Sequence, residues 1–181
     1  MHRIFAGMAV WAAALMAAEV GLGIAAKRAS PSLVVPHLIL GVLLGLYVAL
    51  LHVMVMFHFI GSGKEMKEAM AVLGEDAELV RRLRRLKMVV SPLATFAPLL
   101  FGAGVIVGGG AHEKTLGSWA WIHWAIGGAG IALNLYAFPI EYRALVTNLQ
   151  ILREIDERLK REIAPGLFHE AAPAPGESRH E

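Results

Sequence analysis

The sequence predicts an all-α integral membrane protein folded as a four-helix bundle, and three observations support this prediction. Of the 181 residues, 56% are hydrophobic and only 18% are charged. Four apolar runs are each long enough to cross a hydrocarbon core, which takes about 20 residues of helix. The charged residues gather between and after these runs. The predicted spans are residues 4–26, 33–61, 88–110 and 118–140.

The first two spans are separated by a short loop. Residues 4–26 follow a single basic residue, Arg3, as the core of a signal peptide would, but the apolar run is too long for one. We therefore expect an uncleaved spanning helix. Pro31 and Pro36 mark the beginning of the second span, because proline is tolerated in the first turn of a helix. The Gly-Ser-Gly sequence at residues 61–63 predicts its end.

The third and fourth spans carry their own markers. Pro92 and Pro98 predict bends in the third span. The fourth span begins with Trp119, Trp121 and Trp124, and tryptophans are typical of a membrane–water interface. We therefore expect the beginning of the fourth span to lie at the level of the lipid headgroups.

Two polar segments with helical apolar stripes follow the second and fourth spans. Residues 64–87 predict two short amphipathic helices with a break at residues 74–76, and residues 141–163 predict another. Such stripes need a partner, so we expect them to pack on each other, on other membrane subunits or on a second copy of the chain. Residues 1–163 thus form one membrane domain, and residues 164–181 are predicted to be a disordered tail.

The basic residues predict the orientation. Seven lysines and arginines lie between the second and third spans and six follow the fourth, whereas the two short loops hold three. By the positive-inside rule, both termini and both polar segments are cytoplasmic, as expected in a bacterial cytoplasmic membrane. The net charge of +2 is too small to indicate a nucleic-acid partner.

One basic run lies directly before the third span and predicts contact with the lipid bilayer. Each basic residue near an anionic surface contributes about 1 kcal/mol to headgroup binding. The run also satisfies the positive-inside rule by itself, so it can act as a topology signal alone. Its members are Arg81, Arg82, Arg84, Arg85 and Lys87.

Ionisable residues inside the spans are the strongest functional signal, because burying them in a bilayer is costly. His37 lies roughly 6 Å inside the outer end of the second span, and His123 lies about as deep on the fourth. Glu19 on the first span falls in the same layer. If these helices face inward, the two imidazoles can bind one metal ion or one haem iron, with Glu19 as a ligand or as a partner that orients a histidine.

This layout of histidines on separate spans resembles the four-helix membrane b-type cytochromes. The resemblance implies an electron-transfer subunit with haem b, whose axial ligands are His37 and His123. It also implies an inner site, but Ala137 and Phe138 stand where the fourth span needs a second histidine. His52 is therefore either a cofactor-binding residue with an unidentified partner or a hydrogen-bonded core residue.

Two other functions remain open from the residues alone. The chain can be a non-catalytic structural subunit of a larger membrane complex, which predicts no cofactor. It can also be a proton or metal-ion conduit that uses Glu19, His37 and His52. The absence of cysteine excludes disulfides, thiolate metal sites and iron–sulfur clusters. No phosphate loop, HExxH motif or nucleophile elbow indicates an enzyme, so the sequence leaves catalytic activity undecided.

Overall fold

Over the residues that it describes, the computed structural model consists of four long α-helices and two short 3₁₀ helices. These residues are 1–74, 76–112 and 117–169. The elements are α1 (His2–Arg28), η1 (Pro31–Leu33), α2 (Val34–Leu73), α3 (Ala77–His112), η2 (Gly117–Ala120) and α4 (Trp121–His169). No strand occurs in the described ranges, so the all-α prediction is confirmed.

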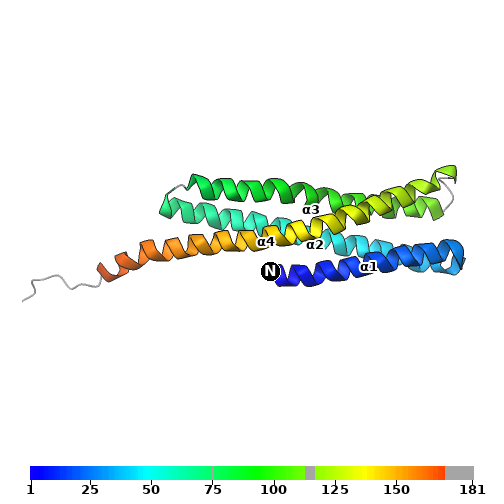
Figure 1. Cartoon of the computed structure of the whole chain (residues 1–181), viewed down its shortest axis with the longest axis horizontal. Helices are drawn as coiled ribbons and strands as arrows, with labels where there is room; N and C mark the ends of the chain where they lie inside the picture. Colours follow the sequence, from blue (N-terminus) through cyan, green and yellow to red (C-terminus); the bar gives the residue numbers. More distant parts are fainter. Residues whose placement is uncertain (75, 113–116, 170–181) are drawn as a thin grey trace, which may run out of the picture.

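The helices form one elongated antiparallel bundle (Figure 1). The 3₁₀ helices η1 and η2 lie together at one end, called here the η end, and the α2–α3 turn lies at the other. The N-terminus lies part-way along the bundle, because α1 is much shorter than the other helices (Figure 1). The η end therefore has four packed helices, and the opposite end has three.

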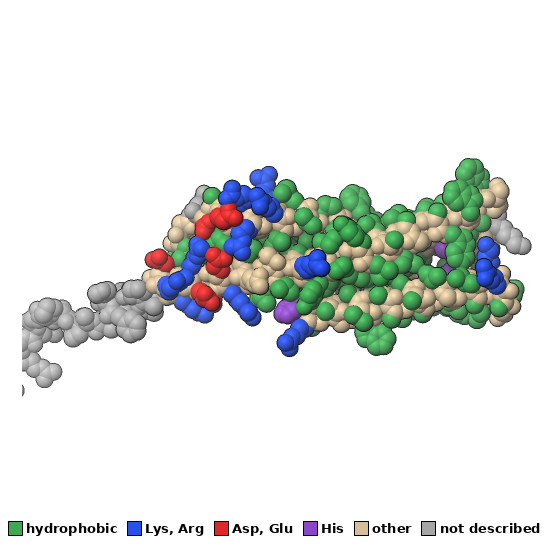
Figure 2. All heavy atoms as spheres, in the orientation of Figure 1, with side chains coloured by type: hydrophobic (Ala, Val, Ile, Leu, Met, Phe, Trp, Pro, Cys, Tyr) green, Lys and Arg blue, Asp and Glu red, His purple; other side chains and the backbone are tan. Residues whose placement is uncertain are grey.

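Three of the helices, α1, α2 and α3, are long and apolar enough to cross a membrane. Helix α4 contains the fourth predicted span but does not belong to this group; its apolar part is interrupted by Asn134 and glycines. Large apolar side chains such as Trp11, Phe57 and Ile106 are exposed on the outside of the bundle. Figure 2 shows this apolar surface over the four-helix part, with charged side chains gathered over the α2–α3 end.

The helices run further than the sequence predicts. Helix α2 continues through residues 61–63 to Leu73, so the predicted end there is wrong. Ser62 and Gly63 are buried, which shows that small residues at this point allow close packing. The expected pair of short helices is thus the end of α2 and the beginning of α3, separated at Gly74, whose φ of +84° suits glycine.

Prolines also lie inside the helices. Pro92 and Pro98 both lie inside α3, and α4 runs past Pro165 to His169. A proline inside a helix removes one hydrogen bond without ending the helix when the flanking turns are supported. Residues 164–169 of the predicted tail are therefore helical, and residues 170–181 lie outside the described residues.

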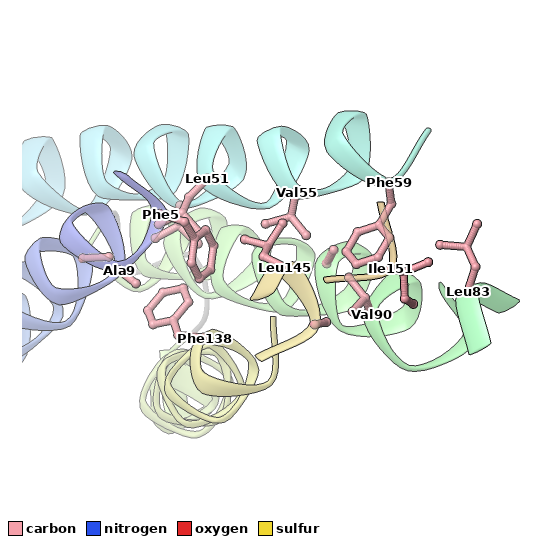
Figure 3. Packing of buried hydrophobic residues seen from close by; sticks show 14 of the residues in the cluster. Phe5, Ala9, Leu51, Val55, Phe59, Leu83, Val90, Phe138, Leu145 and Ile151 are labelled. Carbon is pink, nitrogen blue, oxygen red and sulfur yellow. The ribbon is translucent and has the colours of Figure 1, made fainter. Parts of the chain in front are cut away.

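A continuous core joins the two parts of the bundle (Figure 3). Phe5 of α1 packs with Leu51 of α2 and Phe138 of α4 where all four helices meet. The same cluster continues into the three-helix part through Phe59 and Ile151. The polar segments after the predicted spans therefore bury their apolar stripes within this chain.

Glycines bring α3 and α4 unusually close together. An added Cβ atom at Gly104 would lie 2.9 Å from the Cα of Gly127, and one at Gly130 would lie 2.8 Å from the Cα of Phe101. Small residues at such crossings let backbones approach and gain van der Waals contact, which is the main packing force between helices in lipid.

Candidate functional site

A cavity of about 530 Å³ lies between the four helices near the η end. This volume falls within the range of roughly 300–1,000 Å³ that is usual for small-molecule and cofactor sites. In Figure 2, histidine side chains are visible in a hollow at this end of the bundle. Six of the lining residues are glycines: Gly23, Gly41, Gly104, Gly108, Gly127 and Gly128.

His37 of α2 and Glu19 of α1 enter this cavity together. The Nδ1 atom of His37 lies 2.8 Å from Oε1 of Glu19, at ion-pair distance but without hydrogen-bond alignment. Each side chain lies against a glycine of the opposite helix: His37 against Gly23, and Glu19 against Gly41. A larger residue at either glycine would displace the polar group, so the four residues form one interlocked contact between α1 and α2.

His123 of α4 enters the cavity from the other side. Its Nδ1 atom lies 3.0 Å from the carbonyl oxygen of Gly104. Because a carbonyl oxygen can only accept, Nδ1 carries the proton and donates it, which leaves Nε2 of the neutral ring with a free lone pair. Gly108 makes room for the ring, since an added Cβ there would lie 2.7 Å from its Cε1 atom.

The two imidazoles lie edge to face across the bundle. The ring centroids of His37 and His123 are 6.1 Å apart, and the ring planes are inclined by 73°. A metal–imidazole bond is about 2 Å long, so two imidazoles on opposite sides of one metal have centroids roughly 6 Å apart. The Nδ1 atom of His123 is held by a hydrogen bond, as in many metal-binding histidines, whereas that of His37 only lies at ion-pair distance from Glu19.

This pair does not belong to a larger metal site. Within the described residues, no group of three or more histidine, cysteine, aspartate or glutamate side chains is arranged to hold a metal ion. A bis-imidazole iron porphyrin needs only two protein ligands, because the porphyrin supplies the other four. The two histidines are therefore the candidate ligands that the described residues bring together in this cavity.

His52, the third candidate, lies in a separate polar cluster that is fully buried. Its Nδ1 atom is 2.8 Å from Oε1 of Glu141, and its Nε2 atom is 2.8 Å from Oδ1 of Asn134. The ring also stacks on Phe138. With both ring nitrogens engaged, His52 has no lone pair directed at an occupant of the cavity.

Sequence reasoning missed Glu141 as a partner of His52. Glu141 begins the charged part of α4, which is typical of a residue at the membrane interface, but its side chain is 0% exposed. Asn134 and Glu141 are seven residues apart, about two helical turns, and therefore lie on the same face of α4. That spacing, opposite a histidine on another span, is the signal that could have identified the cluster.

His58 lies in neither cluster. Its Nε2 atom is 3.2 Å from the side-chain nitrogen of Asn148, and its ring is partly exposed. The side chain of His112 lies outside the described part of the structure.

The predicted lipid-binding run divides into two groups. Arg81 pairs with Glu78, and Arg82 lies 3.0 Å from a carboxylate oxygen of Glu154. Lys87 is partly buried, with its ammonium group against α2 at Gly63. The exposed members without an ion pair among the described residues are Arg84 and Arg85.

No protein-family model matches the chain, and no curated protein and no solved structure matches it. The cavity and its two imidazoles are therefore the observations that bear on function.

Proposed function

We propose that this chain is a small membrane electron-transfer subunit in which His37 and His123 hold one b-type haem. The pair of imidazoles supports this proposal most directly. They come from different helices, meet across a cavity of suitable size and have centroids 6.1 Å apart. The glycines that line the cavity add support, because Gly23, Gly41 and Gly108 make room for the side chains of His37, Glu19 and His123 between the helices.

The residues around the ligands have distinct roles in this proposal. The Gly104 carbonyl accepts a hydrogen bond from Nδ1 of His123, which orients its Nε2 atom and strengthens it as a ligand. Glu19 lies at ion-pair distance from Nδ1 of His37 and places a carboxylate beside that ring. Apolar side chains such as Phe101 and Val105 exclude water from the inner part of the cavity. A bound haem would supply one-electron chemistry, and the protein would set its potential through these ligands, hydrogen bonds and burial.

We further infer that α4 is the fourth span and that both termini are cytoplasmic. The exposed Trp119 and Trp121 at the η end suit a headgroup layer, and the concentration of basic residues at the α2–α3 end suits the cytoplasmic side. This orientation puts His37 and His123 in the outer half of a bacterial cytoplasmic membrane.

Arg84 and Arg85 are the residues of the basic run that remain free to bind anionic lipid headgroups. Native mass spectrometry should show more bound phosphatidylglycerol than phosphatidylcholine, and the difference should decrease in the variant with both residues changed to glutamine. Equal lipid binding by this variant and the wild type would leave the run as a topology signal alone.

A visible spectrum of the protein purified from haem-replete cells tests the main proposal. We expect a Soret band that sharpens on reduction and an electron paramagnetic resonance signal of low-spin bis-imidazole iron. Both should disappear in His37→Ala and in His123→Ala. His58→Ala is the matched control, because this partly exposed histidine lies outside the cavity, and it should retain both signals.

The same preparation separates the two rival functions. A folded, colourless and iron-free protein that copurifies with other subunits would overturn the haem proposal in favour of a structural subunit. A colourless protein that carries protons or metal ions across liposomes would overturn it in favour of a conduit.

A further inference from the structure

The cavity has a charged mouth and an apolar interior. Lys27 and Ala26 line it near the end of α1, and Trp121 and Trp124 line it near the beginning of α4. These residues are close to η1 and η2, and this end of the cavity is called here its mouth. Further along the same helices, towards the middle of the bundle, the lining consists mainly of glycines and apolar side chains, including Phe101, Val105 and Ile131.

Lys27 is the one lysine or arginine among the described residues that line the cavity. Its ammonium group lies 5.4 Å from the ring centroid of Trp124, a favourable cation–π position at the mouth. No ion pair joins it to a carboxylate in the described part of the chain. The other charged lining residue, Glu19, already lies against His37.

An occupant that fits this lining is amphipathic, with an anionic edge at the mouth and an apolar edge inside. A b-type haem has this shape, because both of its carboxylates are on one edge of the ring. A carboxylate beside Lys27 would gain a charge-assisted hydrogen bond near the low-dielectric membrane interior, where such a bond is stronger than in water.

Building on the haem function proposed above, we propose that Lys27 binds a carboxylate of the occupant and thereby orients it, with its anionic edge toward the η end. Lys27 is a positioning residue in this scheme, since His37 and His123 hold the iron. Lys27 is exposed and has no ion pair among the described residues, so it can bind a carboxylate without first breaking one. The competing explanation is that Lys27 only extends to lipid headgroups, as lysines near the ends of spans commonly do.

Esterified haem tests this proposal. The detergent-solubilised apoprotein is titrated with haem and with haem dimethyl ester, which lacks both negative charges, and binding is followed by the Soret band. We expect the wild type to bind haem about tenfold more tightly than the ester, the effect of one charge-assisted hydrogen bond. Lys27→Gln should lose this preference, and Lys27→Arg should restore it.

The control is Arg28→Gln, which removes the neighbouring exposed cation that does not line the cavity, and it should keep the full preference. Resonance Raman propionate bands should shift in Lys27→Gln and not in Arg28→Gln. Equal binding of haem and ester by the wild type, with an intact bis-imidazole spectrum, would overturn the role of Lys27 and leave the haem function standing. Failure to bind either compound would overturn both.

Discussion

The amide of Asn134 determines which nitrogen of His52 carries a proton. Its Nδ2 atom donates to the carbonyl oxygens of Ala97 and Gly130, at 2.9 and 2.7 Å. The Oδ1 atom therefore faces His52 as an acceptor, so Nε2 of His52 must be a donor. One further proton can be shared between Nδ1 of His52 and Oε1 of Glu141. With that proton in place, His52 and Glu141 together carry no net charge.

Asn134 should consequently be important for stability. Asn134→Ala leaves the buried Nε2–H of His52 without an acceptor, which costs about 1–3 kcal/mol in addition to the lost packing. We expect a clear decrease in the free energy of unfolding, measured by denaturation in mixed micelles. Asn148→Ala is the matched control: Asn148 is also fully buried on α4, but its Oδ1 atom has no partner. Equal losses in the two variants would show that the His52 cluster has no special role.

Glycines beside the two imidazoles should matter for ligand position more than for folding. At Gly108 the three atoms nearest to an added methyl group all belong to the ring of His123, which can rotate away, so Gly108→Ala should fold normally but displace His123. Haem affinity should then decrease at least tenfold in Soret titrations. Gly109→Ala is the neighbouring control, because an added Cβ there has no atom within 4 Å. Unchanged affinity in Gly108→Ala would contradict the role of His123 as a ligand.

At the scale of the helices, residues 61–63 show how a sequence signal can mislead. Glycine and serine commonly end a helix, but they also let two helices pack closely, and only the neighbouring helix distinguishes the two cases. Ser62 and Gly63 are buried, and Lys87 of α3 lies against Gly63, whereas Gly61 is exposed. The heptad-like apolar pattern beyond residue 63 is compatible with either a new helix or a continued one.

Gly61→Ala tests the continuous helix directly. An exposed glycine inside a helix is less favourable than alanine by about 0.5–1 kcal/mol, and an added Cβ at Gly61 has no atom within 4 Å. We therefore expect Gly61→Ala to raise the free energy of unfolding by that amount. If residues 61–63 formed a turn with glycine-specific backbone angles, the same substitution would destabilise the protein.

The α2–α3 turn depends on one carboxylate. Asp76 accepts hydrogen bonds from the backbone amides of Glu78 and Leu79 and lies 2.6 Å from Nη1 of Arg158 on α4. The amide of Leu79 and the Arg158 guanidinium hold the pKa of Asp76 below its ordinary value. A carboxyl whose pKa is lower in the folded state stabilises the fold above the ordinary pKa of about 4 and loses this effect as the pH falls through the lowered value.

Asp76→Asn should therefore have a pH-dependent effect. Asparagine can still cap the helix but cannot pair with Arg158, so we expect a lower melting temperature than the wild type at pH 6. The difference should become smaller as the pH decreases below about 4 and the wild-type carboxylate is protonated. Asp156→Asn, which removes an exposed pair within α4, is the control and should show little effect at either pH. A constant difference between Asp76→Asn and wild type would contradict the ion-pair role.

At the scale of the whole molecule, the sequence predicts most of the helical fold but less of the polar interior. Apolar runs and charge clusters are local signals, so the four long apolar segments and the α2–α3 break could be predicted, but not the continuation of α2 and α4 beyond their apolar segments. The proximity of Glu19, His37 and His123 also followed from their depth along the spans. The one local signal of the His52 cluster is the seven-residue spacing of Asn134 and Glu141, because Glu141 looks like any charged residue at the end of a span until the packing of α2 against α4 is known.

The orientation of the molecule is the remaining large-scale prediction, and the absence of cysteine makes it accessible to labelling. Ser118→Cys puts an exposed thiol at the η end, and Lys67→Cys puts one near the α2–α3 end, so α3 separates the two positions. With an impermeant maleimide on intact spheroplasts, we expect Ser118→Cys to be labelled and Lys67→Cys to react only after lysis. The reverse pattern would put the cavity on the cytoplasmic side. Equal access to both thiols would show that α3 does not cross the membrane.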